Sequence, residues 1–192
     1  MDLETKAAPV IQSIFNTLQI PSGEDYNYLM NYLALLAVRT PTQIEQTASL
    51  MEQMAKFTMD AILEPLGARN WSVVYSPHTI GDFICSDHPV SLHWIEQKDR
   101  GIYSSPGFGR LGTEVTIPLS KRVMLLGRFD EEQMPRTIML DSQLNLACLN
   151  SYSIIDCSRL IFSCTEDFLW YTQEEKIGTI ADLRRVSKIR GE

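Results

Sequence analysis

The sequence predicts an α+β fold in which a helical N-terminal part is followed by a mostly antiparallel sheet. Apolar residues recur with helical spacing in residues 1–67, whereas residues 70–192 contain short β-branched and aromatic runs bounded by Pro, Gly, Asp or Ser. Helices and strands therefore occupy separate parts of the chain instead of alternating as in βαβ units. We expect about three helices, then about five to six strands with one or two C-terminal helices, in a single domain spanning residues 1–192.

Three helices are expected in the N-terminal part. Residues 9–18 place proline at the first helical position and then repeat apolar residues every four positions. Residues 22–38 open with a serine that can cap the helix. Residues 40–67 open with Thr-Pro-Thr-Gln, which combines a capping box with a first-position proline, and close at a glycine.

The sheet is expected from five short runs, which are residues 71–75, 82–85, 90–94, 113–117 and 123–126. Helical spacing returns in residues 138–153. A last strand is expected at residues 159–164 and a last helix at residues 179–189.

Composition limits the class of partner. The chain has 192 residues and a formal net charge of −7, from 17 Lys+Arg and 24 Asp+Glu. Because nucleic acids and anionic lipids are bound mainly by Lys and Arg, bulk nucleic-acid binding is not expected. The longest apolar run, residues 32–38, is too short to span a membrane, and no basic and apolar leader opens the chain. We therefore expect a cytoplasmic protein whose partner is another protein or a second copy of itself.

Two features that resemble cofactor or metal sites fail on inspection. No two of the four cysteines are separated by the two residues typical of zinc knuckles and redox dithiols, so we expect unpaired thiols. Residues 107–112 match Gly-x-Gly-x-x-Gly, but the following residues form a strand pattern, whereas a dinucleotide loop must open a helix. Neither a metal nor a cofactor is expected.

The densest polar segment is residues 85–90, and it contains the candidate carboxylate Asp87. On a structural interpretation, Asp87 caps backbone amides of the turn before Pro89. A nuclease or hydrolase interpretation pairs Asp87 with Glu114, helped by Asp82. That pattern is incomplete, because the position two residues after Glu114 is Thr116 instead of a lysine.

Three segments resemble one family. Residues 33–41 end in Arg-Thr-Pro, residues 82–90 read Asp-Phe-Ile-Cys-Ser-Asp-His-Pro-Val, and residues 117–120 read Ile-Pro-Leu-Ser. In this order they resemble the bacterial domain-of-unknown-function family DUF4238. The chain departs from the family pattern at Cys85, His88 and Lys121, and we expect it to lack the His-Tyr-Val-Pro-like segment that opens longer members.

The resemblance implies candidate site positions but no reaction, since the family has no established activity. The positions are Arg39, Ser86, Asp87 and Ser120, of which Arg39, Ser86 and Ser120 are candidates for binding. Our primary hypothesis is a non-catalytic interaction or regulatory domain of a bacterial family. The alternative is a hydrolase or nuclease-like effector in which Asp87 acts with Glu114 and Asp82 while Arg39 holds an anion. Whether the protein is an enzyme stays open at this point.

Overall fold

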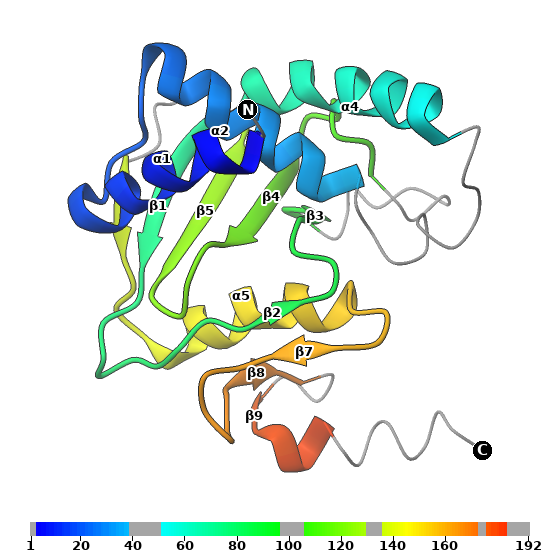
Figure 1. Ribbon diagram of the computed structural model, residues 1–192. Helices are drawn as coiled ribbons and strands as arrows, with labels where there is room; N and C mark the ends of the chain where they lie inside the picture. The colour runs from blue at the N-terminus through cyan, green and yellow to red at the C-terminus, as the bar shows by residue number, and fades with distance from the viewer. Residues whose placement is uncertain (1–2, 39–50, 97–105, 130–135, 173–175, 184–192) are drawn as a thin grey trace.

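The fold is built around one five-stranded sheet with helices on both faces (Figure 1). The computed structural model describes residues 3–38, 51–96, 106–129, 136–172 and 176–183, with the backbone alone for 51–58. The strands lie in the order β3-β4-β5-β1-β6, and all neighbours are antiparallel except β1 and β6. Their bounds are β1 Asn70–Tyr75, β3 Ser91–Trp94, β4 Thr113–Pro118, β5 Val123–Arg128 and β6 Thr137–Met139.

Three helices cover one face of the sheet: α1 (Leu3–Thr17), α2 (Gly23–Val38) and α4 (Met51–Gly67) (Figure 1). The core beneath them joins α1 and α2 to alternate residues of the strands, because successive side chains of a strand point to opposite faces. Its sheet residues are Trp71, Val73, Val115, Ile117, Val123 and Leu125. No helix in the described parts of the chain combines the length and apolar character needed to cross a bilayer.

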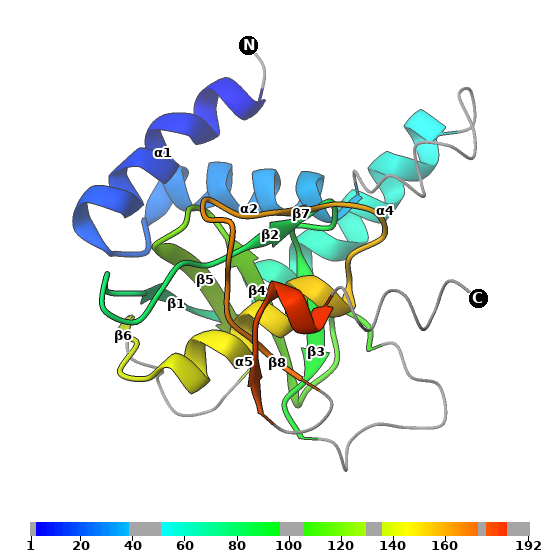
Figure 2. The same ribbon diagram turned by 90° about the horizontal axis from the view of Figure 1, so that it is seen from below.

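The other face is covered by α5 (Gln143–Ile155), which lies between the sheet and one of two short strand pairs, with the other pair beside it (Figure 1 and Figure 2). One pair joins β2 (Cys85–Ser86) to β7 (Ile161–Phe162), and the other joins β8 (Trp170–Tyr171) to β9 (Ile177–Gly178). Val74, Met124 and Leu126 pack with Leu146 of α5 in a second core.

Because α5 is covered on both sides, polar residues within it are buried and bond to the segments around it. The side chain of Asn150 accepts from the Ile84 amide at 3.2 Å and donates to the carbonyls of Asp82 and Leu169 at 3.2 and 2.9 Å. Ser151 accepts from the Tyr171 amide at 2.7 Å. These side chains replace the backbone partners that a longer strand would supply.

The α+β class, the second helix, the end of the third helix at Gly67 and four of the five predicted strands are confirmed. The exception is residues 82–85, where only Cys85 is in a strand, and that strand lies outside the main sheet. The reason is that the backbone of this segment bonds to Asn150 and to the carbonyl of Lys121 instead of a neighbouring strand.

Two predicted helix starts are wrong. The first helix begins at Leu3 with Pro9 inside it, and the fully buried Ala7 extends the apolar stripe upstream of the proline. In residues 138–153 the helix begins only at Gln143, because Ser142 caps it by accepting from the Asn145 amide. The residues before it form β6, which pairs in parallel with β1.

The C-terminal predictions hold in part. The strand predicted at residues 159–164 is β7, but it is not the last, since β8 and β9 follow. A helix begins at Ile180, close to the predicted start, and its description ends at Leu183. The predicted start of the third helix at residues 40–43 and the candidate Arg39 lie outside the described residues.

Candidate functional site

The second and third segments of the family resemblance meet in space. Residues 82–90 pass beside the turn between β4 and β5, and the Phe83 amide donates to the Lys121 carbonyl at 2.9 Å. A cavity lies on each side of this junction. The two cavities and the side chains between them form the candidate site.

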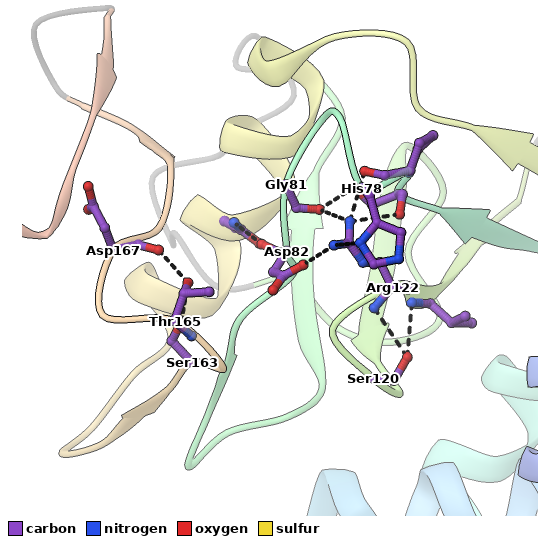
Figure 3. Close-up of polar contacts among 12 residues, drawn as sticks. His78, Gly81, Asp82, Ser120, Arg122, Ser163, Thr165 and Asp167 are labelled. Carbon is purple, nitrogen blue, oxygen red and sulfur yellow. Dashed lines mark hydrogen bonds and ion pairs between the residues drawn. The ribbon is translucent and has the colours of Figure 1, made fainter.

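Arg122 holds the junction together (Figure 3). Its Nη1 donates to three carbonyls of the preceding loop, those of Ser76, Pro77 and Gly81, at 3.3, 2.8 and 3.0 Å. Its Nη2 lies 2.8 Å from Oδ1 of Asp82 in an ion pair whose side chains are only 15% and 10% exposed. The guanidinium therefore fastens the turn before β5 to the loop after β1.

Arg122 also contacts His78. Its Nη2 lies 2.7 Å from Nδ1 of His78. A guanidinium can only donate, so Nδ1 accepts in this contact. Nε of Arg122 is buried without an acceptor, and Oδ1 of Asp82, although ion-paired with Nη2, receives no hydrogen bond.

The first cavity, which we call the acidic cavity, has a volume of about 280 Å³. It is lined by His78, Gly81, Asp82, Arg122, Leu146, Thr165, Asp167, Phe168 and Leu169. Asp167 accepts from the Ile180 amide through Oδ1 at 3.2 Å. In the described parts of the chain, Asp82 receives no hydrogen bond, its Oδ1 being in an ion pair with Arg122, and Oδ2 of Asp167 has no hydrogen-bond partner.

The second cavity, which we call the thiol groove, has a volume of about 270 Å³. It lies between β2, β7 and the turn after β4, and is lined by Phe83, Ile84, Cys85, Pro118, Leu119, Ser120, Lys121, Phe162, Ser163 and Cys164. Phe162 is 55% exposed, which is unusual for so large an apolar side chain beside an apolar groove. Burial raises the pKa of the Cys85 thiol, so this sulfur is protonated at neutral pH.

Asp87 does accept backbone amides, but the partners differ from the prediction. Its two oxygens accept from the amides of Ser158 and Arg159, at 3.0 and 2.9 Å, instead of from the turn at residues 86–90. The backbone amide of Asp87 donates to the Leu160 carbonyl at 3.0 Å. Burial acts to raise the pKa of Asp87, but the amide hydrogen bonds and nearby His88 outweigh it and lower this pKa. The carboxylate thus ties β2 to the chain between α5 and β7.

The two candidate serines serve their own turns. Ser86 is buried, donates to the His88 carbonyl at 2.9 Å and accepts from the His88 amide at 3.2 Å. Ser120 accepts from the amides of Arg122 and Val123 at 3.2 and 3.1 Å, and this hydroxyl also lines the thiol groove.

Glu114 belongs to a different network on the face of the sheet that α5 covers. It is 3% exposed, and its Oε2 accepts from Nε and Nη2 of Arg128 at 2.9 and 2.5 Å. Burial raises the pKa of Tyr152 on α5, and the Glu114 carboxylate raises it further. The predicted pairing of Asp87 with Glu114 is not found among the described residues, because each carboxylate is held by other partners.

His93 extends this network. Its ring stacks on Tyr152 with centroids 4.1 Å apart, and its Nε2 lies 3.1 Å from Oδ2 of Asp156 without the geometry of a hydrogen bond. His93 faces Glu114 in the register of β3 and β4. The sequence interpretation missed Arg122, Arg128 and Tyr152. A signal existed only for Arg122, which lies two residues after Ser120 of the Pro-Leu-Ser segment.

Comparison with known proteins identifies a family for this chain. Residues 42–167 match the model of a family described as "Protein of unknown function (DUF4238)". No curated protein and no solved structure matches the chain. The matched region contains the junction of residues 82–90 with the turn after β4, together with all of α5. The family model spans more than half of the sequence, and the chain therefore belongs to the DUF4238 family of proteins of unknown function.

Proposed function

We propose that this protein is a non-catalytic interaction domain that binds a protein partner through the thiol groove. The observation that carries the proposal is the contrast between the candidate catalytic side chains, which hold the fold together, and the exposed Phe162 beside an apolar groove. An interaction site of this kind needs no reacting group.

The catalytic alternative is not favoured because its carboxylates are already engaged. Asp87 accepts two backbone amides, and Glu114 is buried against Arg128. Asp82 is nearly buried and ion-paired with Arg122. A metal-dependent nuclease needs at least two carboxylates directed at one reacting centre.

The groove offers a partner apolar surface with a polar rim, which is the usual anatomy of an interface. Phe162 and Leu160 are 55% and 56% exposed, and lie on either side of Ile161, which packs into a core. Since alternate residues of a strand share a face, Phe162 and Leu160 point outward together. Covering one such side chain contributes about 1.5–3 kcal/mol.

The proposal also bears on two of the predicted binding residues and on the predicted cellular location. Ser120 lines the groove, which supports a role in binding, and the anion-binding role of Arg39 stays a prediction. An intracellular location is supported by the four cysteines, all of which are free thiols.

The test is site-specific photo-crosslinking in cells. A photoreactive amino acid replaces Cys164 in the groove or, as a control, the exposed Asp60 on α4, on the opposite face of the sheet. We expect one protein to be crosslinked at position 164 only. Phe162→Ser should abolish this product, whereas Leu144→Ser, at a 47% exposed leucine outside the groove, should leave it unchanged. Equal crosslinking at positions 60 and 164, or a product insensitive to Phe162→Ser, would reject the proposal.

A further inference from the structure

We propose that the acidic cavity is a binding site for a cationic group on an aliphatic stem, either an alkylguanidinium or an alkylammonium ion. This site is separate from the thiol groove, so the inference does not depend on the proposed function. It follows from the hydrogen bonds of Arg122, the charges on the wall and the shape of the cavity.

Arg122 cannot serve as an anion receptor, although it lines the cavity. Its terminal nitrogens donate to three carbonyls and to His78, and Nη2 is ion-paired with Asp82. Its remaining donor, Nε, is a buried atom without solvent access. An incoming phosphate or carboxylate would therefore have to displace the Asp82 carboxylate from the guanidinium.

The wall carries a net negative charge. Asp82 and Asp167 contribute two carboxylates and Arg122 one guanidinium, so the formal charge of these three side chains is −1. The Asp82 side chain is 10% exposed, and its Oδ1 is buried and receives no hydrogen bond, although Nη2 of Arg122 lies 2.8 Å away. A carboxylate that is nine-tenths buried and lacks hydrogen-bond donors favours a ligand that supplies one, and a cation supplies the strongest.

The rest of the wall suits an aliphatic stem. Leu146, Phe168 and Leu169 form its apolar part, while Thr165 and Asp167 are exposed residues of the lining. The volume of about 280 Å³ is at the lower end of the range for small-molecule sites, so the ligand is the size of one amino-acid side chain or a short free amine. Free alkylamines and the Arg or Lys side chains of a polypeptide share this chemistry.

The first experiment is an NMR titration of the full chain, labelled with nitrogen-15, with n-butylguanidinium. We expect amide shifts in residues 78–82 and 165–169 with a dissociation constant of about 1 mM, as befits so small a ligand. The neutral isostere n-butylurea should bind at least about tenfold more weakly, because it lacks the charge that the carboxylates attract. Equal binding of the two compounds, no binding of n-butylguanidinium, or stronger binding of butyrate would overturn the inference.

Two carboxylate variants locate the site. Asp167→Asn keeps an oxygen that accepts from the Ile180 amide but removes the charge, so we expect about fivefold weaker binding of n-butylguanidinium. The matched control is Glu166→Gln, at an exposed neighbouring carboxylate that is not part of the cavity lining, and should leave binding unchanged. Asp82→Asn should weaken binding more. If that variant does not fold, Asp167→Asn decides the question, and unaltered binding in it overturns the inference.

The source of the cation is distinguished by a second ligand. Acetyl-Gly-Arg-Gly-amide presents the same guanidinium on a polypeptide. Binding equal to that of n-butylguanidinium would show that a protein side chain can enter the cavity. Binding of n-butylguanidinium alone would show that the cavity takes a free small-molecule cation. The proposal fails if neither ligand shifts the amides of the cavity wall.

Discussion

Asp87 uses both carboxylate oxygens to hold backbone amides of a distant segment, so it acts as a cross-link within the fold. The amides of Ser158 and Arg159 have no helix or sheet partner at this point of the chain, and the carboxylate supplies one. Asp87 thus accepts backbone amides, as its structural interpretation predicts, but from a different segment of the chain. Amide hydrogen bonds of this type stabilise the charged form of a carboxyl group.

We therefore predict that Asp87→Asn destabilises the protein by about 1 kcal/mol at pH 7, a modest value because the group is solvent-screened. The pKa of Asp87 is lowered below its ordinary 3.8 in the folded state, so its contribution is complete above about pH 5 and is lost as the pH falls through the folded-state pKa. Urea unfolding should therefore show a difference between wild type and variant at pH 7 that shrinks toward pH 3. The control Asp60→Asn should change little at either pH. An unchanged midpoint at pH 7 with lost cellular function would support the catalytic alternative instead.

The four free thiols should differ in reactivity in the native protein. Burial raises the pKa of Cys85, Cys148 and Cys157, whereas Cys164 is exposed. Because the thiolate is the reactive form, a chromogenic disulfide reagent should modify Cys164 first, with the other three following only on unfolding. Mass spectrometry of partially labelled protein identifies the site. A total of two thiols in the unfolded protein without reductant would contradict the assignment of four.

At the scale of the element, Arg122 links the turn after β4 to the loop after β1. Arg122→Met leaves the nearly buried Asp82 carboxylate without its partner and removes donors from three carbonyls. We expect a loss of about 3–5 kcal/mol in the free energy of unfolding. The double variant with Asp82→Asn should lose less than the sum of the single losses, because the two groups are coupled. Arg110→Met, at an exposed arginine, is the control, and additive losses in the double variant would contradict the coupling.

A second element-scale prediction concerns Gly127 on β5, which lies opposite Trp71 on the neighbouring strand β1. A Cβ at this position would lie 2.9 to 3.0 Å from three ring atoms of Trp71. The ring cannot easily move away, because its Nε1 donates to the Leu66 carbonyl at 2.9 Å. We expect Gly127→Ala to cost about 1–3 kcal/mol in urea unfolding. Gly107→Ala, where a Cβ meets nothing within 4 Å, is the control, and equal effects of the two variants would contradict the packing argument.

Elements whose partners are close in sequence were predictable, and those that depend on distant side chains were not. The hairpin of β4 and β5 is an example of the first kind, since periodicity and a short turn define it. Residues 82–85 are an example of the second, because they become a separate segment only through Asn150 on α5. The same reason explains why the candidate site was predicted only in part. The polar residues of positions 82–90 were identified, but their partners Arg122 and Ser158 are far along the chain.

At the scale of the whole molecule, the sheet couples its two faces. Leu125 belongs to the core under α1 and α2, and its neighbour Met124 belongs to the core against α5. Both side chains are fully buried. Any loss of packing on one face therefore acts on strands that also support the other. This arrangement favours the single domain predicted from the sequence.

We accordingly predict that residues 1–192 unfold as one cooperative unit. Leu125→Ala and Met124→Ala remove buried side chains from opposite faces of β5, and each should cost about 2–5 kcal/mol. Hydrogen–deuterium exchange during urea unfolding, read from peptides of α2 and α5, should show both helices unfolding at the same midpoint in the wild type. Each variant should shift the two midpoints equally, because β5 cannot leave one core without leaving the other. If Met124→Ala released α5 while α2 stayed protected, the two faces would be separate folding units and the single-domain prediction would be wrong.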